Sequence, residues 1–268
     1  MDSPFNLHAP ARPRVPIIVS VPHCGTMFPD EIRGDYKPAL IAKPDDTDWF
    51  VDQLYDFAPD IGMTMITAVH SRWVIDLNRD PDSKPLYTDG RIITALCPTT
   101  TFLGEPLYND EREDVAADEV QRRLDTYYHP YHAQLQRLLD EALHKFGRAL
   151  LWDCHSIRQI VPTIQAGQFP DLILGDADGS SASAQLIDTA MHHLQSGGYQ
   201  LSHNHPFKGG TITRRFGQPA RNQHALQLEM CKVHYMDDGE TRYDKNRADR
   251  MREVLKRTLS SLAELLTA

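Results

Sequence analysis

Two histidines stand at the ends of apolar segments, a position where side chains often do chemistry. His23 lies near the end of segment 14–25, and His155 lies near the end of segment 148–156. Each segment predicts a buried strand, and functional groups of open α/β sheets gather beyond the carboxyl ends of the strands. His23 and His155 are therefore candidate ligands of one metal ion, although a single histidine at a strand end is more often structural.

An acidic cluster could supply a third ligand. Asp45, Asp46 and Asp48 precede a helix that we expect over residues 49–58. Capping of that helix explains at least one of these carboxylates, because a helix N-terminus favours acceptors and negative charge. Another could complete a site of two histidines and one carboxylate, which leaves a coordination position open for water, as in hydrolytic zinc enzymes. The residue types do not show which aspartate does which.

Glu229 stands inside the otherwise apolar segment 224–230. A buried glutamate is costly unless it is paired or functional, so a structural salt bridge and a catalytic role are both open. If Glu229 faces the metal, its carboxylate is suited to accept a proton from an attacking water.

Two further segments carry groups that suit a carboxylate. Segment 71–79 ends with Asn78 and Arg79, and the segment around the glycine pair at 209–210 continues to Arg214. Arginine binds carboxylates through two parallel hydrogen bonds, and asparagine can donate beside it. Taken singly, an arginine at a strand end is more often an ordinary surface residue.

Composition limits the class of protein. Of 268 residues, 41% are hydrophobic and 24% are charged, which is typical of a globular protein, and we expect one domain over residues 1–268. The net charge of −9 disfavours general nucleic-acid binding and means that an acidic ligand needs local arginines.

No segment has the length and hydrophobicity of a membrane span or signal peptide, so we expect a cytoplasmic location. Without a paired motif, we expect the cysteines to be free thiols, namely Cys24, Cys97, Cys154 and Cys231.

The elements alternate between strands and helices. We expect strands in segments 14–25, 63–69, 73–77, 148–156, 171–174, 199–203 and 224–230, and helices over 49–58, 114–146, about 181–194 and 247–266. Pro130 should kink the second helix or divide it. This order predicts an α/β fold with a mixed, largely parallel β-sheet flanked by helices.

At these residues the chain resembles the N-formylglutamate amidohydrolase family. The matching segments run in the expected order from about residue 17 to 236, namely VPHCG, DTDW, SRWVIDLNR, LCPTTTF, GEPLY, YYHPYH, LWDCHS, FKGGTITRRFG and ALQLEM. Each segment is a weak signal, whereas the ordered set is specific. The family is similar in turn to zinc carboxypeptidases and related deacylases, which implies a sandwich of that kind with zinc at the carboxyl edge of the sheet.

The resemblance also implies roles for individual residues. It makes His23, His155 and Asp48, in preference to Asp46, the zinc ligands, and it makes Glu229 the general base. Asn78 with Arg79, and Arg214 with Arg72, would hold the two carboxylates of the substrate. Cys24 departs from the family, which more often has serine there, and a thiol beside a ligand could alter metal affinity or sensitivity to oxidation.

The implied activity is zinc-dependent hydrolysis of N-formyl-L-glutamate to formate and L-glutamate, as in histidine degradation. One alternative keeps the zinc site, or another divalent transition metal, and changes the substrate to another N-formyl or N-acyl amino acid. A cysteine hydrolase using Cys24 or Cys154 is disfavoured, because Cys154 and His155 should point to opposite faces of a strand. A binding module without activity is disfavoured because the ligands and the base are all present. The oligomeric state cannot be read from the sequence.

Overall fold

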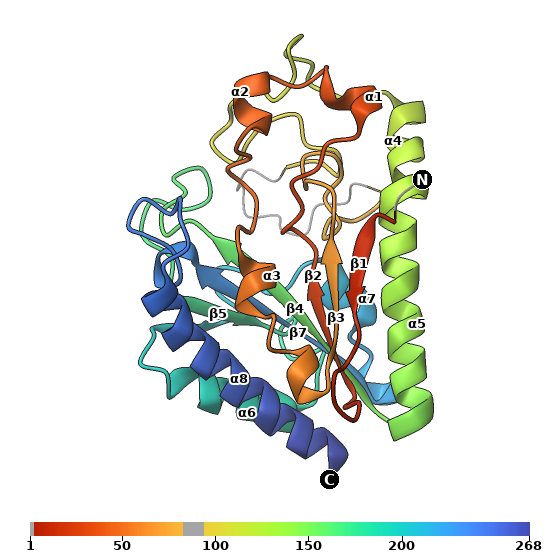
Figure 1. Cartoon of the computed structure of the whole chain (residues 1–268), viewed down its shortest axis with the longest axis vertical. Helices are drawn as coiled ribbons and strands as arrows, with labels where there is room; N and C mark the ends of the chain where they lie inside the picture. The colour runs from red at the N-terminus through yellow and green to blue at the C-terminus, as the bar shows by residue number, and fades with distance from the viewer. Residues whose placement is uncertain (1–2, 83–93) are drawn as a thin grey trace.

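A seven-stranded sheet forms the centre of the computed structural model, which describes residues 3–82 and 94–268 (Figure 1). The strand order is β1-β3-β2-β4-β7-β5-β6. Four neighbouring pairs are parallel, while β1 with β3 and β5 with β7 are antiparallel. This confirms the predicted mixed, largely parallel α/β sheet. The strands are β1 (Phe5–His8), β2 (Ile17–Val21), β3 (Thr64–Ala68), β4 (Ala149–Ile157), β5 (Leu172–Gly175), β6 (Leu201–His203) and β7 (Gln223–Cys231).

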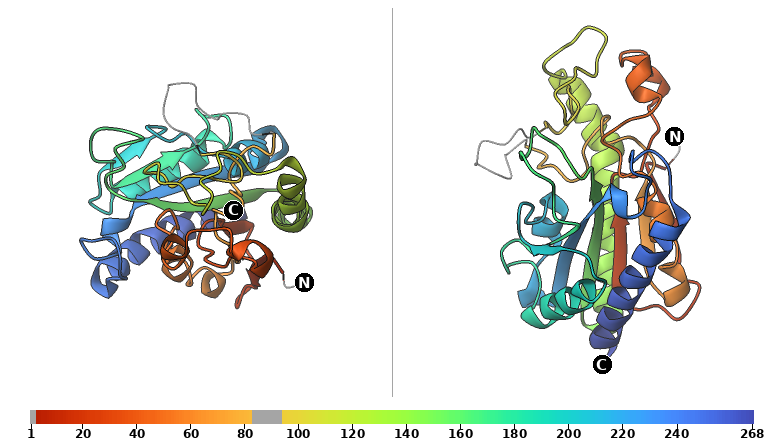
Figure 2. Two further views of the ribbon diagram at one scale, coloured as in Figure 1. Left: turned by 90° about the horizontal axis from the view of Figure 1, so that it is seen from above. Right: turned by 90° about the vertical axis from the view of Figure 1, so that its left-hand side faces the viewer.

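Helices cover both faces of the sheet, because its central strands are buried on both sides. The helices are α1 (Asp30–Arg33), α2 (Pro38–Ile41), α3 (Val51–Leu54), α4 (Ala117–Arg123), α5 (His129–Phe146), α6 (Ala184–Gln195), α7 (Thr211–Phe216) and α8 (Lys245–Thr267). One apolar core packs α3, α6 and α8 against one face, and a second packs α5 and α7 against the other. Figure 2 shows α8 and α7 on opposite sides of the sheet. Within the two described ranges, no helix is both long and apolar enough to cross a membrane.

Six of the seven predicted strands are present, and the strand predicted over 73–77 is wrong. Segment 71–79 is a buried series of turns, although Trp73, Val74 and Ile75 are as buried as any strand residue. Its backbone bonds are local or made to another loop, for example from Val74 N to Ser71 O and from Asp76 N to Leu96 O. An apolar segment shows burial but not strand pairing, and that ambiguity caused the error.

Two helix predictions needed correction in their bounds. The helix expected over 49–58 is only α3, preceded by Phe50 in the left-handed region at φ 63°. The helix expected over 114–146 is divided, as Pro130 suggested. A π-helical turn at Leu124–Tyr128 joins α4 to α5, and Pro130 lies in the first turn of α5, where its missing N–H is tolerated.

The predicted site segments meet at the carboxyl edge of the sheet. His23 follows β2, His155 is near the end of β4, and Glu229 is near the end of β7. These three strands are parallel neighbours, so their carboxyl ends lie together. In the pairing of β4 with β7, His155 stands directly opposite Glu229. In Figure 1 the loops that carry α1 and α2 lie beyond this edge, above β2 and β3.

A candidate metal centre at the carboxyl edge of the sheet

His23, Asp48 and His155 form one compact buried group. One ligand atom from each lies within 4.8 Å of the other two, and no other group of this kind occurs in the part of the chain that the structure describes. Asp48 Oδ2 is 3.2 Å from His155 Nδ1 and 3.7 Å from His23 Nδ1. Asp48 is held against the histidine segment by its own backbone, since Asp48 N donates to His23 O at 2.9 Å.

The donor set fits a metal ion. Among the described residues, His23 Nδ1 and Asp48 Oδ1 are buried without a hydrogen-bond partner. Burying a polar atom without a hydrogen-bond partner costs free energy. A cation that both atoms face would explain why two such atoms lie on neighbouring residues. Two imidazole nitrogens and one carboxylate oxygen are the donors of hydrolytic zinc sites. The histidines also lower the pKa of Asp48 by hydrogen bonding, against the raising effect of burial, so this carboxylate is charged and ready to bind.

Each histidine has a buried carboxylate behind it. His23 Nε2 lies 2.8 Å from Asp76 Oδ1, and His155 Nε2 lies 3.0 Å from Asp153 Oδ2. If each Nε2–H donates to its carboxylate, the Nδ1 lone pair is left for a metal ion, and the rings are fixed in orientation. Asp76 and Asp153 were not predicted as functional from the sequence. The available signal was spacing, because Asp153 is two residues before His155 and thus on the same face of β4.

A chain of hydroxyl groups supports Asp153 in turn. Ser20 Oγ donates to Asp153 Oδ1 at 3.0 Å and lies 3.0 Å from Tyr131 Oη. Tyr131 comes from α5, within the segment YYHPYH. His132 of that segment is also buried and contacts Leu77 O at 2.8 Å, whereas His129 is exposed. The segment therefore packs beneath the site rather than lining it.

Asp46 has a different role from Asp48. Asp46 Oδ2 accepts hydrogen bonds from Trp73 Nε1 at 2.8 Å and from Phe102 N at 3.0 Å. Burial raises its pKa, against the lowering effect of these bonds. This carboxylate connects three loops and lies outside the group of candidate ligands. The geometry thus favours Asp48 as the ligand.

Glu229 is next to the metal group on the adjacent strand. Its charge interacts with those of His155 and Asp48. Burial is the main reason that the pKa of Glu229 is raised to about 8. A carboxylate with such a pKa can both accept and return a proton near neutral pH, which is the behaviour of a general base that later acts as an acid.

The four residues predicted to bind substrate differ in their contacts. Arg72 is buried, its Nη2 donates to Asp76 Oδ2 at 2.6 Å, and its guanidinium lies over the Phe102 ring. The Asn78 amide nitrogen is 3.0 Å from His155 Nε2. Arg79 is half-buried and donates to Thr94 O at 3.1 Å, and Arg214 is an exposed residue of α7 that donates to Gly209 O. Arg72 and Asn78 thus contact groups around the candidate metal-binding residues, whereas Arg214 is the most accessible to a substrate from solvent.

The thiols beside the ligands do not resemble nucleophiles. Cys154 points into the apolar core on the face of β4 opposite His155. Cys24 Sγ contacts Val21 O and Ala68 O, each at 3.5 Å. Burial raises the pKa of both thiols well above the usual range, which disfavours the reactive thiolate. This agrees with the argument against a cysteine hydrolase.

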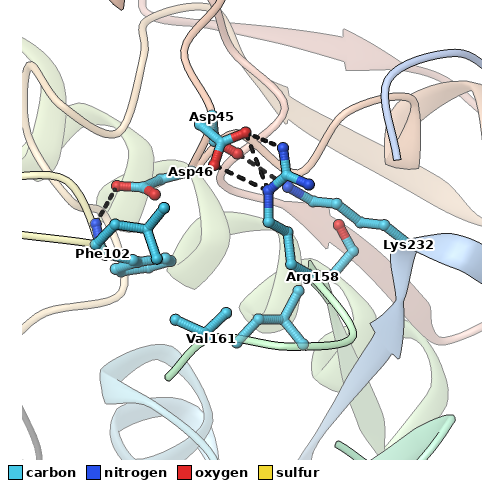
Figure 3. A pocket seen from close by; sticks show the side chains of 9 residues that line it. Asp45, Asp46, Phe102, Arg158, Val161 and Lys232 are labelled. Carbon is cyan, nitrogen blue, oxygen red and sulfur yellow. Dashed lines mark hydrogen bonds and ion pairs between the residues drawn. The ribbon is translucent and has the colours of Figure 1, made fainter. Parts of the chain in front are cut away.

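Lys232, a residue that the sequence did not single out, lies beside the site. It is only 3% exposed and follows β7, three residues after Glu229. Lys232 lines a small cavity together with Asp45 and Arg158, and Figure 3 shows both cations pointing toward Asp45. A lysine directly after a strand is ordinarily a surface residue, so only the burial distinguishes it.

Comparisons with known proteins agree with this arrangement. The family model described as N-formylglutamate amidohydrolase matches residues 15–236. An N-formylglutamate deformylase of Pseudomonas putida is 40% identical over 264 residues, covering 98% of this chain and 96% of the relative. One of Pseudomonas aeruginosa is 40% identical over 257 residues, covering 94% of each.

Solved structures are similar over the same length. The crystal structure of N-formylglutamate amidohydrolase from Ralstonia eutropha JMP134 has a TM-score of 0.82 at 28% identity and covers 99% of both chains. A gene product of Agrobacterium tumefaciens shares the fold, with a TM-score of 0.73 at 16% identity, and covers 97% of this chain and 96% of that one. From the family match and the two relatives at 40% identity, this chain belongs to the N-formylglutamate amidohydrolase family.

Proposed function

We propose that this protein hydrolyses the amide bond of N-formyl-L-glutamate to formate and L-glutamate, with a zinc ion held by His23, Asp48 and His155. Two relatives at 40% identity are named N-formylglutamate deformylase. The observation that carries the chemistry is the position of Glu229, directly opposite a candidate ligand in the pairing of β4 with β7. That position supports Glu229 as the carboxylate that would accept a proton from a water molecule at the metal centre.

Zinc, when bound, acts as a Lewis acid and lowers the pKa of a coordinated water to about 7. The chain supplies three ligands, and the carboxylates of Asp76 and Asp153 keep the two histidines in the orientation that binding needs. We propose zinc rather than another divalent transition metal by analogy with the family, since two histidines and a carboxylate could also hold other metals of this class.

Glu229 carries the proton through the reaction. Its carboxylate accepts a proton from the attacking water as the oxygen bonds to the formyl carbon. The resulting tetrahedral intermediate then breaks its C–N bond, and Glu229 returns the proton to the departing amine nitrogen. Formate and the amino acid are released, and Glu229 is a carboxylate again. The raised pKa of Glu229, about 8, supports both halves of this cycle.

Cationic groups around the site would hold the substrate. We propose that Arg79 with Asn78, and Arg214 with Arg72, bind the two carboxylates of N-formyl-L-glutamate. Arginine at a carboxylate offsets the repulsion expected from the net charge of −9. Arg72 Nη2 and the backbone N–H of Asn78 both donate to Asp76, so their contribution includes keeping the carboxylate behind His23 in place.

The decisive test is release of formate from N-formyl-L-glutamate by the purified protein. We expect turnover to disappear after chelation and to return with zinc. A panel with N-formyl-L-aspartate and N-acetyl-L-glutamate tests the alternative that another N-formyl or N-acyl amino acid is the substrate. Absence of formate release by zinc-loaded, folded protein would contradict the substrate assignment, and preference for another panel member would replace it.

Three broader expectations stay proposals. We propose that the chain works as one domain over residues 1–268, because its two apolar cores share one sheet. We propose a cytoplasmic location, consistent with the absence of a membrane-spanning helix in the described ranges. The partner we propose is a small N-acyl amino acid with carboxylates, not a nucleic acid or a membrane.

A further inference from the structure

The segment YYHPYH places three buried polar side chains on one face at the beginning of α5, which runs along the side of the sheet (Figure 1). Tyr128, Tyr131 and His132 are spaced i, i+3 and i+4, and each is at most 1% exposed. We call these three residues the donor face of α5. A π-helical turn, a feature frequent at functional sites, ends at Tyr128 and changes which side chains of the following helix face the sheet.

Tyr131 begins a directed chain of hydrogen bonds that ends at a candidate metal ligand. A carboxylate can only accept, so Ser20 Oγ donates its single hydrogen to Asp153 Oδ1 at 3.0 Å. The contact of 3.0 Å between the two hydroxyls then requires Tyr131 Oη to donate to Ser20 Oγ. Asp153 Oδ2 remains to accept from Nε2–H of His155, at 3.0 Å. The Nδ1 atom of His155, 3.2 Å from Asp48 Oδ2, thereby keeps its lone pair for a metal ion.

The other two side chains of the donor face bind the backbone on either side of Asn78. Tyr128 Oη donates to Arg79 O at 2.8 Å, and His132 Nε2 donates to Leu77 O at 2.8 Å. Both acceptors are carbonyl oxygens, so the direction of each hydrogen bond is fixed. This part of the chain lies in the buried turns of 71–79 rather than in a strand, and its position therefore depends on contacts such as these.

We propose that the donor face of α5 positions both parts of the site. Tyr131 fixes the ring of His155 for metal binding, and Tyr128 with His132 fixes segment 77–79 for substrate binding. All three are positioning residues, because each acts through another group. The substrate part rests on the proposed function, since that segment carries two of the residues proposed to hold a carboxylate. The metal part requires only the candidate metal centre.

Two conservative variants separate the two parts. Tyr131→Phe should weaken zinc binding about 3- to 10-fold, the effect of one hydrogen bond, in competition with a chromophoric chelator. Its KM for N-formyl-L-glutamate, measured at saturating zinc, should change less than about twofold. Tyr128→Phe should show the reverse, with wild-type zinc affinity and a KM raised about 3- to 10-fold. A role in packing alone would lower the thermal midpoint of both variants without this division.

A double-mutant cycle tests whether Tyr131 acts through Asp153. Asp153→Ala removes the link between Ser20 and the histidine, so adding Tyr131→Phe to it should weaken zinc binding further by less than about twofold. Ser20→Ala interrupts the same chain one step earlier and should weaken zinc binding as much as Tyr131→Phe does. This second variant keeps the test decisive if Tyr131→Phe folds poorly.

Tyr55→Phe is the matched control. Tyr55 Oη is also buried and accepts from Trp152 Nε1 at 3.1 Å, on the opposite face of β4. The variant removes one buried hydroxyl from a contact with the same strand, and it should keep both the zinc affinity and the KM of the wild type.

Each part of the inference has its own contrary result. Wild-type zinc affinity in Tyr131→Phe and Ser20→Ala, or a loss that adds fully to that of Asp153→Ala, would overturn the metal part. An unchanged KM in Tyr128→Phe would overturn the substrate part. If the wild-type protein releases no formate from N-formyl-L-glutamate, the proposed function and the substrate part fail together, while the zinc affinities still decide the metal part.

Discussion

Asp153 and His155 leave the same face of β4, two residues apart, and their side chains lie 3.0 Å from each other between Oδ2 and Nε2. One strand therefore carries both a candidate metal ligand and the carboxylate that would orient its ring. Because β4 is paired on both sides, by β2 and β7, the relative position of these two groups is set by a strand that is hydrogen-bonded along both edges.

Replacing Asp153 by asparagine should weaken zinc binding about 10- to 100-fold, because the ligand loses the partner that fixes its ring and raises its basicity. Competition with a chromophoric chelator measures the affinity directly. Asp171 forms a similar pair with His234 outside the site, at 2.6 Å, so Asp171→Asn is the matched control and should keep wild-type affinity. Equal affinities for Asp153→Asn and wild type would show that Asp153 does not support the ligand.

Replacement by asparagine should have different effects at Asp46 and at Asp48. Asp48→Asn removes a charged ligand, and we expect stoichiometric zinc binding to be lost. Asp46→Asn should retain zinc and instead lower the thermal midpoint, because the hydrogen bonds from Trp73 and Phe102 lose their charged acceptor. Metal content after dialysis and thermal unfolding separate the two effects. Zinc loss in Asp46→Asn with zinc retained in Asp48→Asn would reverse the assignment.

Glu229→Gln should reduce kcat about 100- to 10,000-fold while zinc content stays at the wild-type level. Glutamine has nearly the same shape as glutamate but cannot take the proton of the attacking water. Rates from single turnovers, with metal analysis of the same samples, distinguish loss of chemistry from loss of metal. Full turnover by this variant would remove Glu229 from the mechanism.

The catalytic activity should also decrease on the acidic side of the pH profile. A general base must be deprotonated, and burial raises the pKa of Glu229 to about 8, so kcat/KM should fall as the pH decreases through the pKa of this group. A bound dication beside Glu229 favours its charged form and shifts this limb to lower pH. The pH profile of the zinc enzyme measures the result. A kcat/KM that stays constant down to the pH at which the protein loses zinc or unfolds would contradict this assignment.

A stability prediction concerns Arg123, a buried arginine away from the metal ligands. Arg123 Nη1 donates to the hydroxyls of Tyr36 and Tyr108, each at 3.1 Å, and Arg123 Nε donates to Glu119 at 2.7 Å. Glu119→Gln should lower the free energy of unfolding by about 1–3 kcal/mol, because a bond between two charged groups is weakened. Urea unfolding at neutral pH measures this change. An unchanged midpoint and slope would show that the ion pair contributes nothing.

Glu119 also accepts from Arg122, at 2.7 Å, and its ion pairs with the two arginines give the stability a defined pH dependence. Hydrogen bonding from Arg122 is the main cause that lowers the pKa of Glu119 from 4.5 to about 2. A carboxyl whose pKa is lower in the folded state stabilises fully above its unfolded pKa and loses that contribution as the pH falls through its folded pKa. The wild type should therefore lose part of its stability between about pH 4.5 and pH 2, and Glu119→Gln should lose less over this range. Identical pH profiles for the two proteins would count against the ion pair.

The sequence predicted the positions of His23, His155 and Glu229 well, for a physical reason. Parallel strands end at a common edge, so polar residues that close separate apolar segments meet there. Periodicity could not decide between Asp46 and Asp48, which lie in a loop without regular repeat. There the family resemblance favoured Asp48, and the geometry agrees with it.

Other residues around the candidate site gave no signal strong enough to be recognised. Lys232 follows a strand as many surface lysines do, and only the folded structure shows that it is buried. Asp76 stands in a segment that we predicted as a strand but that forms turns, so the direction of its side chain could not be inferred. Lys232 and Asp76 were missed for the same reason. The environment of a side chain depends on long-range packing, which local sequence patterns do not describe.

The pairing of β4 with β7 has a consequence for how this site can change over evolutionary time. His155 and Glu229 lie side by side on the same face of the sheet because nine consecutive residues of each strand are aligned without a bulge. Adding or deleting one residue within either strand would turn its functional side chain toward the opposite core and bring an apolar neighbour in its place. Variation in length should therefore accumulate in the loops beyond the sheet, where it can alter which acyl amino acid is accepted while the chemistry stays the same.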